Sequence, residues 1–99
     1  MKRLLLTILV LVPIANATAT GRLTCEHVSA DKWMSETALS EKLTAEGWTV
    51  RRMKEDGGCW EVYGTMPDGK RVEAYFHPAT GETLLISQRG RTIFRAQGN

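Results

Sequence analysis

The hydrophobic and polar positions of this chain follow three successive patterns. Residues 4–15 carry no charge. A stretch with helical spacing follows later, in which Ala38, Leu39 and Leu43 form a narrow apolar stripe. From Trp48 onward, apolar and polar residues alternate as they do in half-buried β-strands. This order predicts an uncharged N-terminal segment, one helix and an antiparallel sheet.

Start and stop signals predict a helix over residues 35–46. Ser35 is a good N-cap, because its hydroxyl can accept a hydrogen bond from a backbone N–H of the first turn. Gly47 supplies the left-handed position that follows many helices, and Trp48 can fold back on Leu43 as in a Schellman cap.

Turn signals separate four alternating segments after the helix. The predicted strands cover residues 48–54, 59–65, 71–77 and 82–88. The turns between them are Glu55-Asp56-Gly57-Gly58, Pro67-Asp68-Gly69-Lys70 and Pro78-Ala79-Thr80-Gly81. Leu84 and Ile86 share one face of the fourth strand. We therefore expect an α+β fold in which one N-terminal helix packs on one face of a three- to four-stranded antiparallel sheet.

The uncharged N-terminal segment is typical of a secretory signal peptide. Two basic residues precede it, and small residues follow it, which predicts cleavage near Ala17 or Ala19. A membrane-spanning helix needs about 20 apolar residues, whereas this run is shorter and contains Pro13. An uncleaved anchor is the alternative interpretation.

Removal of such a leader divides the chain into three parts. We expect a signal peptide at residues 1–19, a folded domain at residues 20–88 and a basic C-terminal tail at residues 89–99. The mature protein is then expected in the periplasm or outside the cell, without stable insertion in a membrane.

Export changes how the two cysteines are interpreted. In an oxidising compartment, Cys25 and Cys59 form the only possible intramolecular pair. A redox or metal-binding role is the alternative. Against it, the sequence contains no C-x-x-C motif, and no histidine cluster flanks either cysteine. We therefore predict a structural disulfide.

The net charge also depends on the leader. The chain has 13 basic and 11 acidic residues, and two of the basic ones lie in the leader, so the mature protein is balanced. This balance argues against a nucleic-acid binder, which would be expected to keep a basic excess. Arg89, Arg91 and Arg95 form a terminal segment without acidic residues. That segment is either a solvated terminus or a contact for anionic lipid or an acidic partner.

The turns and the strands between them resemble those of a known family. The relevant runs are Gly47-Trp48-Thr49-Val50, Gly58-Cys59-Trp60-Glu61-Val62-Tyr63, Asp68-Gly69-Lys70-Arg71-Val72-Glu73-Ala74-Tyr75-Phe76 and Pro78-Ala79-Thr80-Gly81-Glu82. Together they resemble a PepSY domain of the small, exported, single-domain kind, with Gly47, Asp68, Gly69, Pro78 and Gly81 as the motif turn residues. One position departs from the family pattern, because His77 stands where an acidic residue is usual.

The resemblance implies a binding or inhibitory module without chemistry or cofactor of its own. PepSY domains occur in the propeptides of thermolysin-like metallopeptidases, so the expected partner is a peptidase or another envelope protein, and not a nucleic acid. Alternation predicts a solvent-facing contact surface made of Glu61, Tyr63, Glu73, Tyr75 and His77. The alternative is that these side chains form only cross-strand pairs on a solvated face. A sheet edge offers a second route to a partner, by accepting an added strand.

Two other function classes have weaker sequence support. The chain lacks H-E-x-x-H and G-x-S-x-G, and an exposed Glu61–Glu73 pair would lack the preorganisation that catalysis requires, so we do not expect an enzyme. The alternative function is a periplasmic small-ligand or metal-binding protein for copper or haem. Its candidate ligands are scattered along the chain and comprise His27, Met34, Met53, Met66 and His77.

Overall fold

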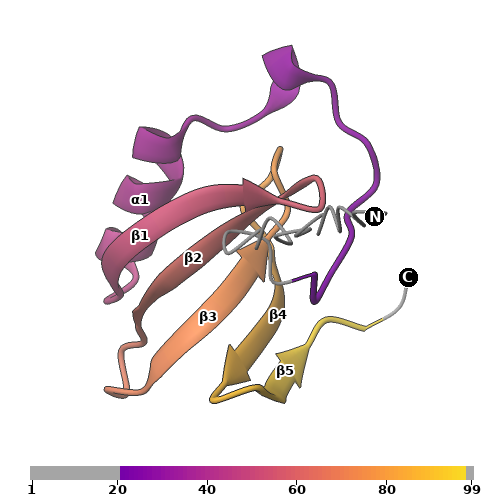
Figure 1. Ribbon diagram of the computed structural model, residues 1–99. Coiled ribbons are helices and arrows are strands. Elements are labelled where there is room, and N and C mark those ends of the chain that lie inside the picture. The colour runs from indigo at the N-terminus through magenta and orange to yellow at the C-terminus, as the bar shows by residue number, and fades with distance from the viewer. Residues whose placement is uncertain (1–20, 98–99) are drawn as a thin grey trace, which may run out of the picture.

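One α-helix and a five-stranded antiparallel sheet make up residues 21–97, the part of the chain that the structure, a computed structural model, describes (Figure 1). The elements are a 3₁₀ turn at Ala30–Lys32, α1 (Glu36–Ala45), β1 (Thr49–Asp56), β2 (Cys59–Thr65), β3 (Arg71–Phe76), β4 (Thr83–Gln88) and β5 (Arg91–Arg95). The strands are neighbours in the order in which they occur along the chain. The α+β class is confirmed, whereas the expected number of three to four strands is wrong.

The signals that predicted α1 act as expected at both ends. The Ser35 hydroxyl accepts a hydrogen bond from the Ala38 backbone N–H at 3.0 Å. At the other end, the Trp48 backbone N–H donates to the Leu43 carbonyl at 2.9 Å, and Gly47 has a φ of 99°. This is the geometry of a Schellman cap, which satisfies carbonyls that the helix itself leaves free.

The main hydrophobic core lies between α1 and one face of the sheet, the helix-side face. Leu39 and Leu43 of α1 are fully buried there. The sheet and the residue before it contribute Trp48, Trp60, Val62, Val72, Ala74, Phe76 and Ile86. Full burial of one such large apolar side chain stabilises a protein by about 1.5–3 kcal/mol. This face is therefore the principal source of hydrophobic stability.

The turn between β1 and β2 is shorter than predicted. Glu55 and Asp56 belong to β1, and only Gly57 and Gly58 form the turn, with φ values of 60° and 81°. Two consecutive positive φ values are typical of the tight hairpin turns whose twist matches that of the strands. A Cβ atom on Gly57 would lie 2.4 Å from the Leu23 carbonyl oxygen, so this turn also accommodates a second segment of the chain.

The expected basic tail is partly a strand. Residues 91–95 form β5, which pairs with β4 through Phe94 and Ile86 after a two-residue turn at Arg89 and Gly90. The segment has only three residues between its arginines, too few to show alternation clearly in the sequence. Its pairing with β4 is a tertiary contact that propensity alone does not reveal.

A bulge changes the expected pattern of β4. Tyr75 pairs with Leu85, but the next pair skips Leu84, which is half-buried. Leu85 and Ile86 are the buried leucine and isoleucine of this strand, and they belong to two different apolar clusters. The expectation that Leu84 and Ile86 share one core face is therefore wrong, because a bulge inserts one residue into the alternation.

The segment before α1 crosses the other face of the sheet, the helix-free face. We call residues 21–25 the strap. A disulfide joins Cys25 to Cys59, as predicted, with the two Cα atoms 5.4 Å apart. Leu23 and Cys25 pack against a small cluster that contains Tyr75 and Leu85. The strap thus gives the sheet a second, smaller covering layer.

The predicted leader at residues 1–19 and its cleavage positions near Ala17 and Ala19 lie outside the described residues. Within residues 21–97, no helix is both long and apolar enough to cross a membrane.

Candidate functional site on the helix-free face

The strand register places two rows of side chains on the helix-free face. One row runs through Lys54, Glu61, Tyr75 and Leu85. The next row runs through Arg52, Tyr63, Glu73 and Ser87. The first row lies toward the strap and the disulfide, whereas the second lies toward the end of the sheet that carries the β4–β5 turn. We call these the covered half and the open half of the face.

The structure corrects the expected contact surface. Glu61 and Tyr75 are each 0% exposed in the 99-residue chain, so the prediction that they face solvent is wrong. Tyr75 packs against the strap, which strand alternation cannot reveal because the strap comes from before the helix. Tyr63, Glu73 and His77 are half-buried. Of these three, Tyr63 and Glu73 are directly paired across β2 and β3.

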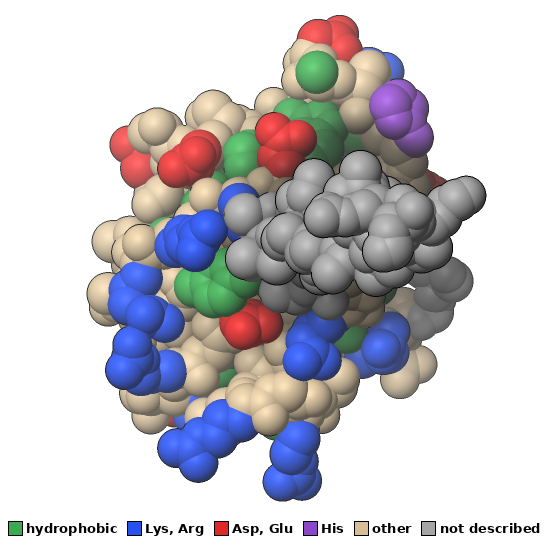
Figure 2. Space-filling model, viewed as in Figure 1, with side chains coloured by type: hydrophobic (Ala, Val, Ile, Leu, Met, Phe, Trp, Pro, Cys, Tyr) green, Lys and Arg blue, Asp and Glu red, His purple; other side chains and the backbone are tan. Residues whose placement is uncertain are grey.

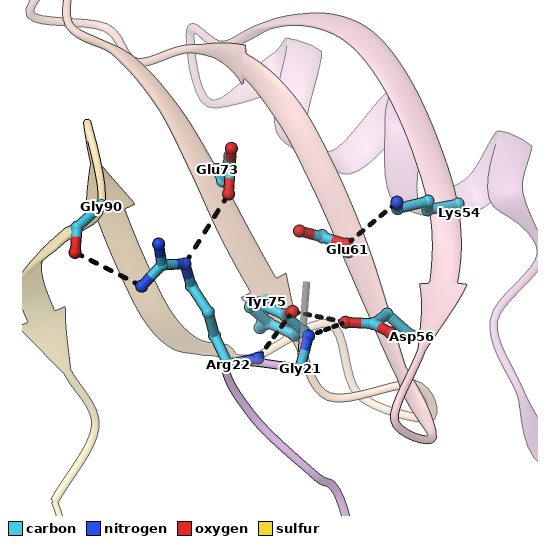
Figure 3. Close-up of polar contacts among 8 residues, drawn as sticks. All are labelled: Gly21, Arg22, Lys54, Asp56, Glu61, Glu73, Tyr75 and Gly90. Carbon is cyan, nitrogen blue, oxygen red and sulfur yellow. Dashed lines mark hydrogen bonds and ion pairs between the residues drawn. The ribbon is translucent and has the colours of Figure 1, made fainter. Parts of the chain in front are cut away.

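Asp56 organises the covered half, and its role was not predicted from the sequence. The Tyr75 hydroxyl donates to Asp56 Oδ2 at 2.5 Å, and the Gly21 backbone N–H donates to the same oxygen at 3.2 Å (Figure 3). The Arg22 backbone N–H donates to the Tyr75 hydroxyl oxygen at 3.3 Å. A hydrogen bond to a charged group is stronger than one between neutral groups. These bonds fix the strap to β1 and β3.

A buried ion pair lies between the two halves. Lys54 Nζ is 3.7 Å from Glu61 Oε1, and it also lies 5.3 Å from the centre of the Tyr63 ring. The Arg52 guanidinium is 5.6 Å from that ring on the same strand as Lys54. Burial raises the pKa of Tyr63, and the carboxylates of Glu61 and Glu73 act in the same direction, against the opposing effect of Lys54. The phenol therefore remains a hydrogen-bond donor at neutral pH.

Arg22 connects the strap to the open half. Its Nε lies 3.9 Å from Glu73 Oε2, and its Nη1 donates to the Gly90 carbonyl at 3.4 Å (Figure 3). Both side chains of the ion pair are about one-third exposed, at 35% and 36%, so the pair itself contributes little to stability. Its effect is to place the strap, β3 and the β4–β5 turn next to one another.

The open half contains a hollow of about 150 Å³. We call it the arginine hollow, and its lining includes Arg51, Tyr63, Arg71, Glu73, Ser87 and Arg89. Figure 2 shows Lys and Arg side chains gathered along β1 and around the end of the sheet with the β4–β5 turn, whereas acidic side chains gather toward the top of the view. Residues 21–97 carry equal numbers of basic and acidic side chains, but these charges are separated in space.

His77 has a structural role in the turn after β3. Its Nδ1 accepts hydrogen bonds from the backbone N–H groups of Ala79 and Thr80, at 3.1 Å and 3.3 Å. A carboxylate oxygen accepts bonds of this kind in many turns, so the imidazole performs the task expected of the usual acidic residue. His77 lies at the end of β3 away from Arg71. It therefore does not join the arginine hollow.

The remaining motif residues also form turns. Gly81 has a φ of 75°, and a Cβ there would lie 2.9 Å from Met34 Sδ, so a larger residue would push the turn away from the start of α1. Asp68 accepts from the Lys70 backbone N–H at 3.0 Å and from Lys70 Nζ at 2.9 Å. These bonds lower the pKa of Asp68. Gly69 between them has a φ of 92°.

The candidate metal ligands serve mainly in packing. Met34, Met53 and Met66 pack against the helix-side core, and His27 is exposed. Among residues 21–97, no group of three or more His, Cys, Asp or Glu side chains could hold a metal ion. A second hollow, of about 830 Å³, lies at the disulfide end. Its lining includes Leu23, Glu26, His77, Glu82, Leu84 and Arg95.

Comparison with models of protein families gives a match. A family model described as peptidase propeptide and YPEB domain, PepSY_2, matches residues 3–85 of the 99-residue chain. The match includes α1, β1, β2 and β3, and it begins within the segment predicted as a leader. No curated protein and no solved structure gives a significant match.

Proposed function

Because this chain belongs to the family of peptidase propeptide and YPEB domains, we propose that it is a non-catalytic, exported binding module that modulates or inhibits a peptidase or another envelope protein. Family membership supports a peptidase-related role. The Cys25–Cys59 disulfide supports export, because such bonds persist in oxidising compartments.

The main support for the proposed contact function is that the open half of the helix-free face combines an aromatic ring with arginines on a β-sheet. Tyr63 is half-buried beside Glu73, and arginines surround both residues. Tyr and Arg are enriched among the residues that dominate protein interfaces. The neighbouring strap is held by a disulfide, so little conformational entropy is lost when a partner binds this face.

Co-purification and inhibition assays with matched variants test this function. The disulfide-bonded protein is used to retain proteins from an envelope extract, and it is also added to a thermolysin-like metallopeptidase. We expect Tyr63→Ala to reduce retention or inhibition about tenfold, the loss of a typical interface hot spot. Glu41→Ala, an exposed change on α1, should have no effect. Tyr75→Ala is unsuitable, because Tyr75 is buried and bonded to Asp56.

Two results would overturn the contact function. The first is that the folded wild-type protein neither retains an envelope protein nor slows the peptidase. The second is that Glu41→Ala reduces binding as much as Tyr63→Ala does, since the contact would then lie on α1.

A second candidate function is small-ligand binding, which the hollow near the disulfide favours. Its volume of about 830 Å³ lies within the range of about 300–1,000 Å³ that is usual for small-molecule sites. Copper, zinc and haem should each be tested by thermal shift with the purified protein. A stabilisation that His77→Ala abolishes would support this function, and no shift with any of the three would exclude these ligands.

A further inference from the structure

Three arginines from separate parts of the sheet meet at the arginine hollow. Arg51 comes from β1, Arg71 begins β3, and Arg89 lies in the β4–β5 turn. Within residues 21–97, none of the three forms an ion pair. Glu73, the acidic residue of the lining, is already paired with Arg22. All three arginines are exposed, and positively charged residues that line one small space attract negative charge, so the hollow favours an anionic occupant.

Ser87 adds a hydrogen-bond donor to the lining of the hollow. It is 1% exposed, yet it lines the hollow. Its hydroxyl oxygen is not among the fully buried side-chain atoms of the described residues that lack a hydrogen bond, so it is reachable from the hollow. The hydroxyl can therefore donate to an acceptor bound there, and the protonated Tyr63 phenol can donate to the same occupant.

Arg89 adds a third observation, from the backbone. Its φ of 51° places it in the left-handed region, followed by Gly90 at 82°. Turns of this kind favour Asn-Gly or Asp-Gly, because most residues with a Cβ atom are strained in the left-handed region, whereas the short polar side chains of Asn and Asp can form local hydrogen bonds there. The chain nevertheless has an arginine there, and this residue lines the hollow. Strain retained at one residue is characteristic of a functional position.

Size and charge define what the hollow can take. Its volume of about 150 Å³ is below the range of about 300–1,000 Å³ for small-molecule sites, so the hollow matches a group the size of one side chain. Guanidinium groups match the planar geometry of a carboxylate. Glu73 in the wall would oppose a doubly charged phosphate more strongly than a single carboxylate.

We propose that the arginine hollow binds a carboxylate side chain from an acidic segment of a protein partner. This inference rests on the proposed contact function, and it specifies the chemistry of the partner. Arg51, Arg71 and Arg89 neutralise the carboxylate, and the Ser87 hydroxyl donates a hydrogen bond to it.

The direct test is titration of the disulfide-bonded protein with capped hexaglutamate, followed by amide NMR. We expect saturable shifts centred on the amides of Tyr63 and Ser87. Because a hydrogen bond to a charged group is worth about one factor of ten in affinity, Arg71→Glu and Arg89→Glu should each weaken binding at least about tenfold. Arg91→Glu changes net charge equally but lies on β5 outside the hollow, so it should weaken binding less than about threefold.

Arg89→Asn separates a binding role from a structural one. Asparagine tolerates the left-handed conformation, so this variant should melt a few degrees higher than the wild type. The same variant should bind hexaglutamate about fivefold more weakly, because it lacks the cation. A variant that binds as well as the wild type would overturn the proposal, as would a loss of stability and binding together.

Titrations with other charged ligands identify the source of the anion. Hexalysine, vesicles of phosphatidylcholine with phosphatidylglycerol, and single-stranded oligothymidylate are titrated under the same conditions. Tighter binding to vesicles or DNA than to hexaglutamate would overturn the assignment to an acidic protein segment. Equal losses in Arg91→Glu and Arg71→Glu would also overturn it, since attraction would then be nonspecific.

The two proposals fail in different ways. If Arg71→Glu retains its envelope partner as well as the wild type does, the contact function stands and the assignment of the hollow is wrong. If hexaglutamate binds in the hollow but no envelope protein or peptidase is ever engaged, the hollow is an anion site and the contact function is wrong.

Discussion

The two faces of the sheet are covered in different ways. On the helix-side face, α1 lies over a continuous apolar core, with Leu39 and Leu43 fully buried. On the helix-free face, the strap covers only one half through a disulfide, a small apolar cluster and polar bonds to Asp56 and Tyr75. The other half is open and basic. One face thus supplies hydrophobic stability, and the other leaves basic side chains exposed.

Apolar burial and basic charge are therefore separated across a single sheet. Apolar burial requires no particular partner geometry, so the helix-side face tolerates conservative changes of similar volume. The helix-free face depends on charged groups whose positions are set by distant segments of the chain. The effects of substitutions on the two faces should therefore differ in kind as well as in size.

The largest effect is expected from truncation in the helix-side core. Phe76→Ala removes a fully buried ring that packs against Trp48 with the ring centres 5.7 Å apart. Such truncations cost about 3–5 kcal/mol. Denaturant unfolding should show this loss, and a cost below about 1 kcal/mol would mean that this core is not the main source of stability. Glu41→Ala on exposed α1 serves as the control.

Loss of the disulfide should have nearly as large an effect on the other face. Cys59→Ser opens a loop whose ends are 34 positions apart in sequence. The chain-entropy model assigns such a loop about 3–4 kcal/mol, and each kcal/mol moves a domain of this size by about 4–8 °C. The melting temperature should therefore fall by more than about 10 °C. Reduced wild-type protein should melt at the same temperature as the variant. If the variant and the wild type melted at the same temperature under oxidising conditions, the disulfide would not stabilise the fold.

A single hydroxyl tests the polar attachment of the strap. Tyr75→Phe keeps the buried ring and removes the hydroxyl, which donates to Asp56 and accepts from the Arg22 backbone N–H. We expect a loss of about 1–2 kcal/mol, the usual cost of removing a hydrogen bond to a charged group. Hydrogen exchange at the Arg22 and Cys25 amides should also become faster. A variant as stable as the wild type would show that the disulfide alone holds the strap.

The smallest effect is expected at Asp68, in the exposed turn between β2 and β3. Its hydrogen bonds with Lys70 lower its pKa in the folded state, so it stabilises the fold above its unfolded-state pKa. That contribution is lost as pH falls through the folded-state pKa. Melting curves recorded as a function of pH should therefore differ slightly between wild type and Asp68→Asn near neutrality and converge in acid. A constant difference at all pH values would assign the effect to packing.

The features that the sequence predicted depend on local or compositional signals. The caps of α1 need only neighbouring residues, the alternation of β2 and β3 is local, and two cysteines leave one pairing. Even the departure at His77 agrees with a local rule, since its ring accepts the bonds of its own turn. Such signals survive in the sequence because they do not depend on the rest of the fold.

The candidate site was harder to predict, because distant segments assemble it. Asp56 looked like a turn residue, yet it ends β1 and bonds to the strap. The arginines of the hollow come from a bulged strand, a strand start and a turn, and only the register of the five-stranded sheet brings them together. Arg89 looked like part of a basic tail because the pairing of β4 with β5 is not a local property.

Hydrogen exchange on a complex with the envelope partner or peptidase would locate the contact surface on this domain. We expect binding to slow exchange in β2, β3 and the β4–β5 turn, around Tyr63, Ser87 and Arg89, and to leave the exposed side of α1 unchanged. Protection confined to α1, with no change around the arginine hollow, would contradict this expectation.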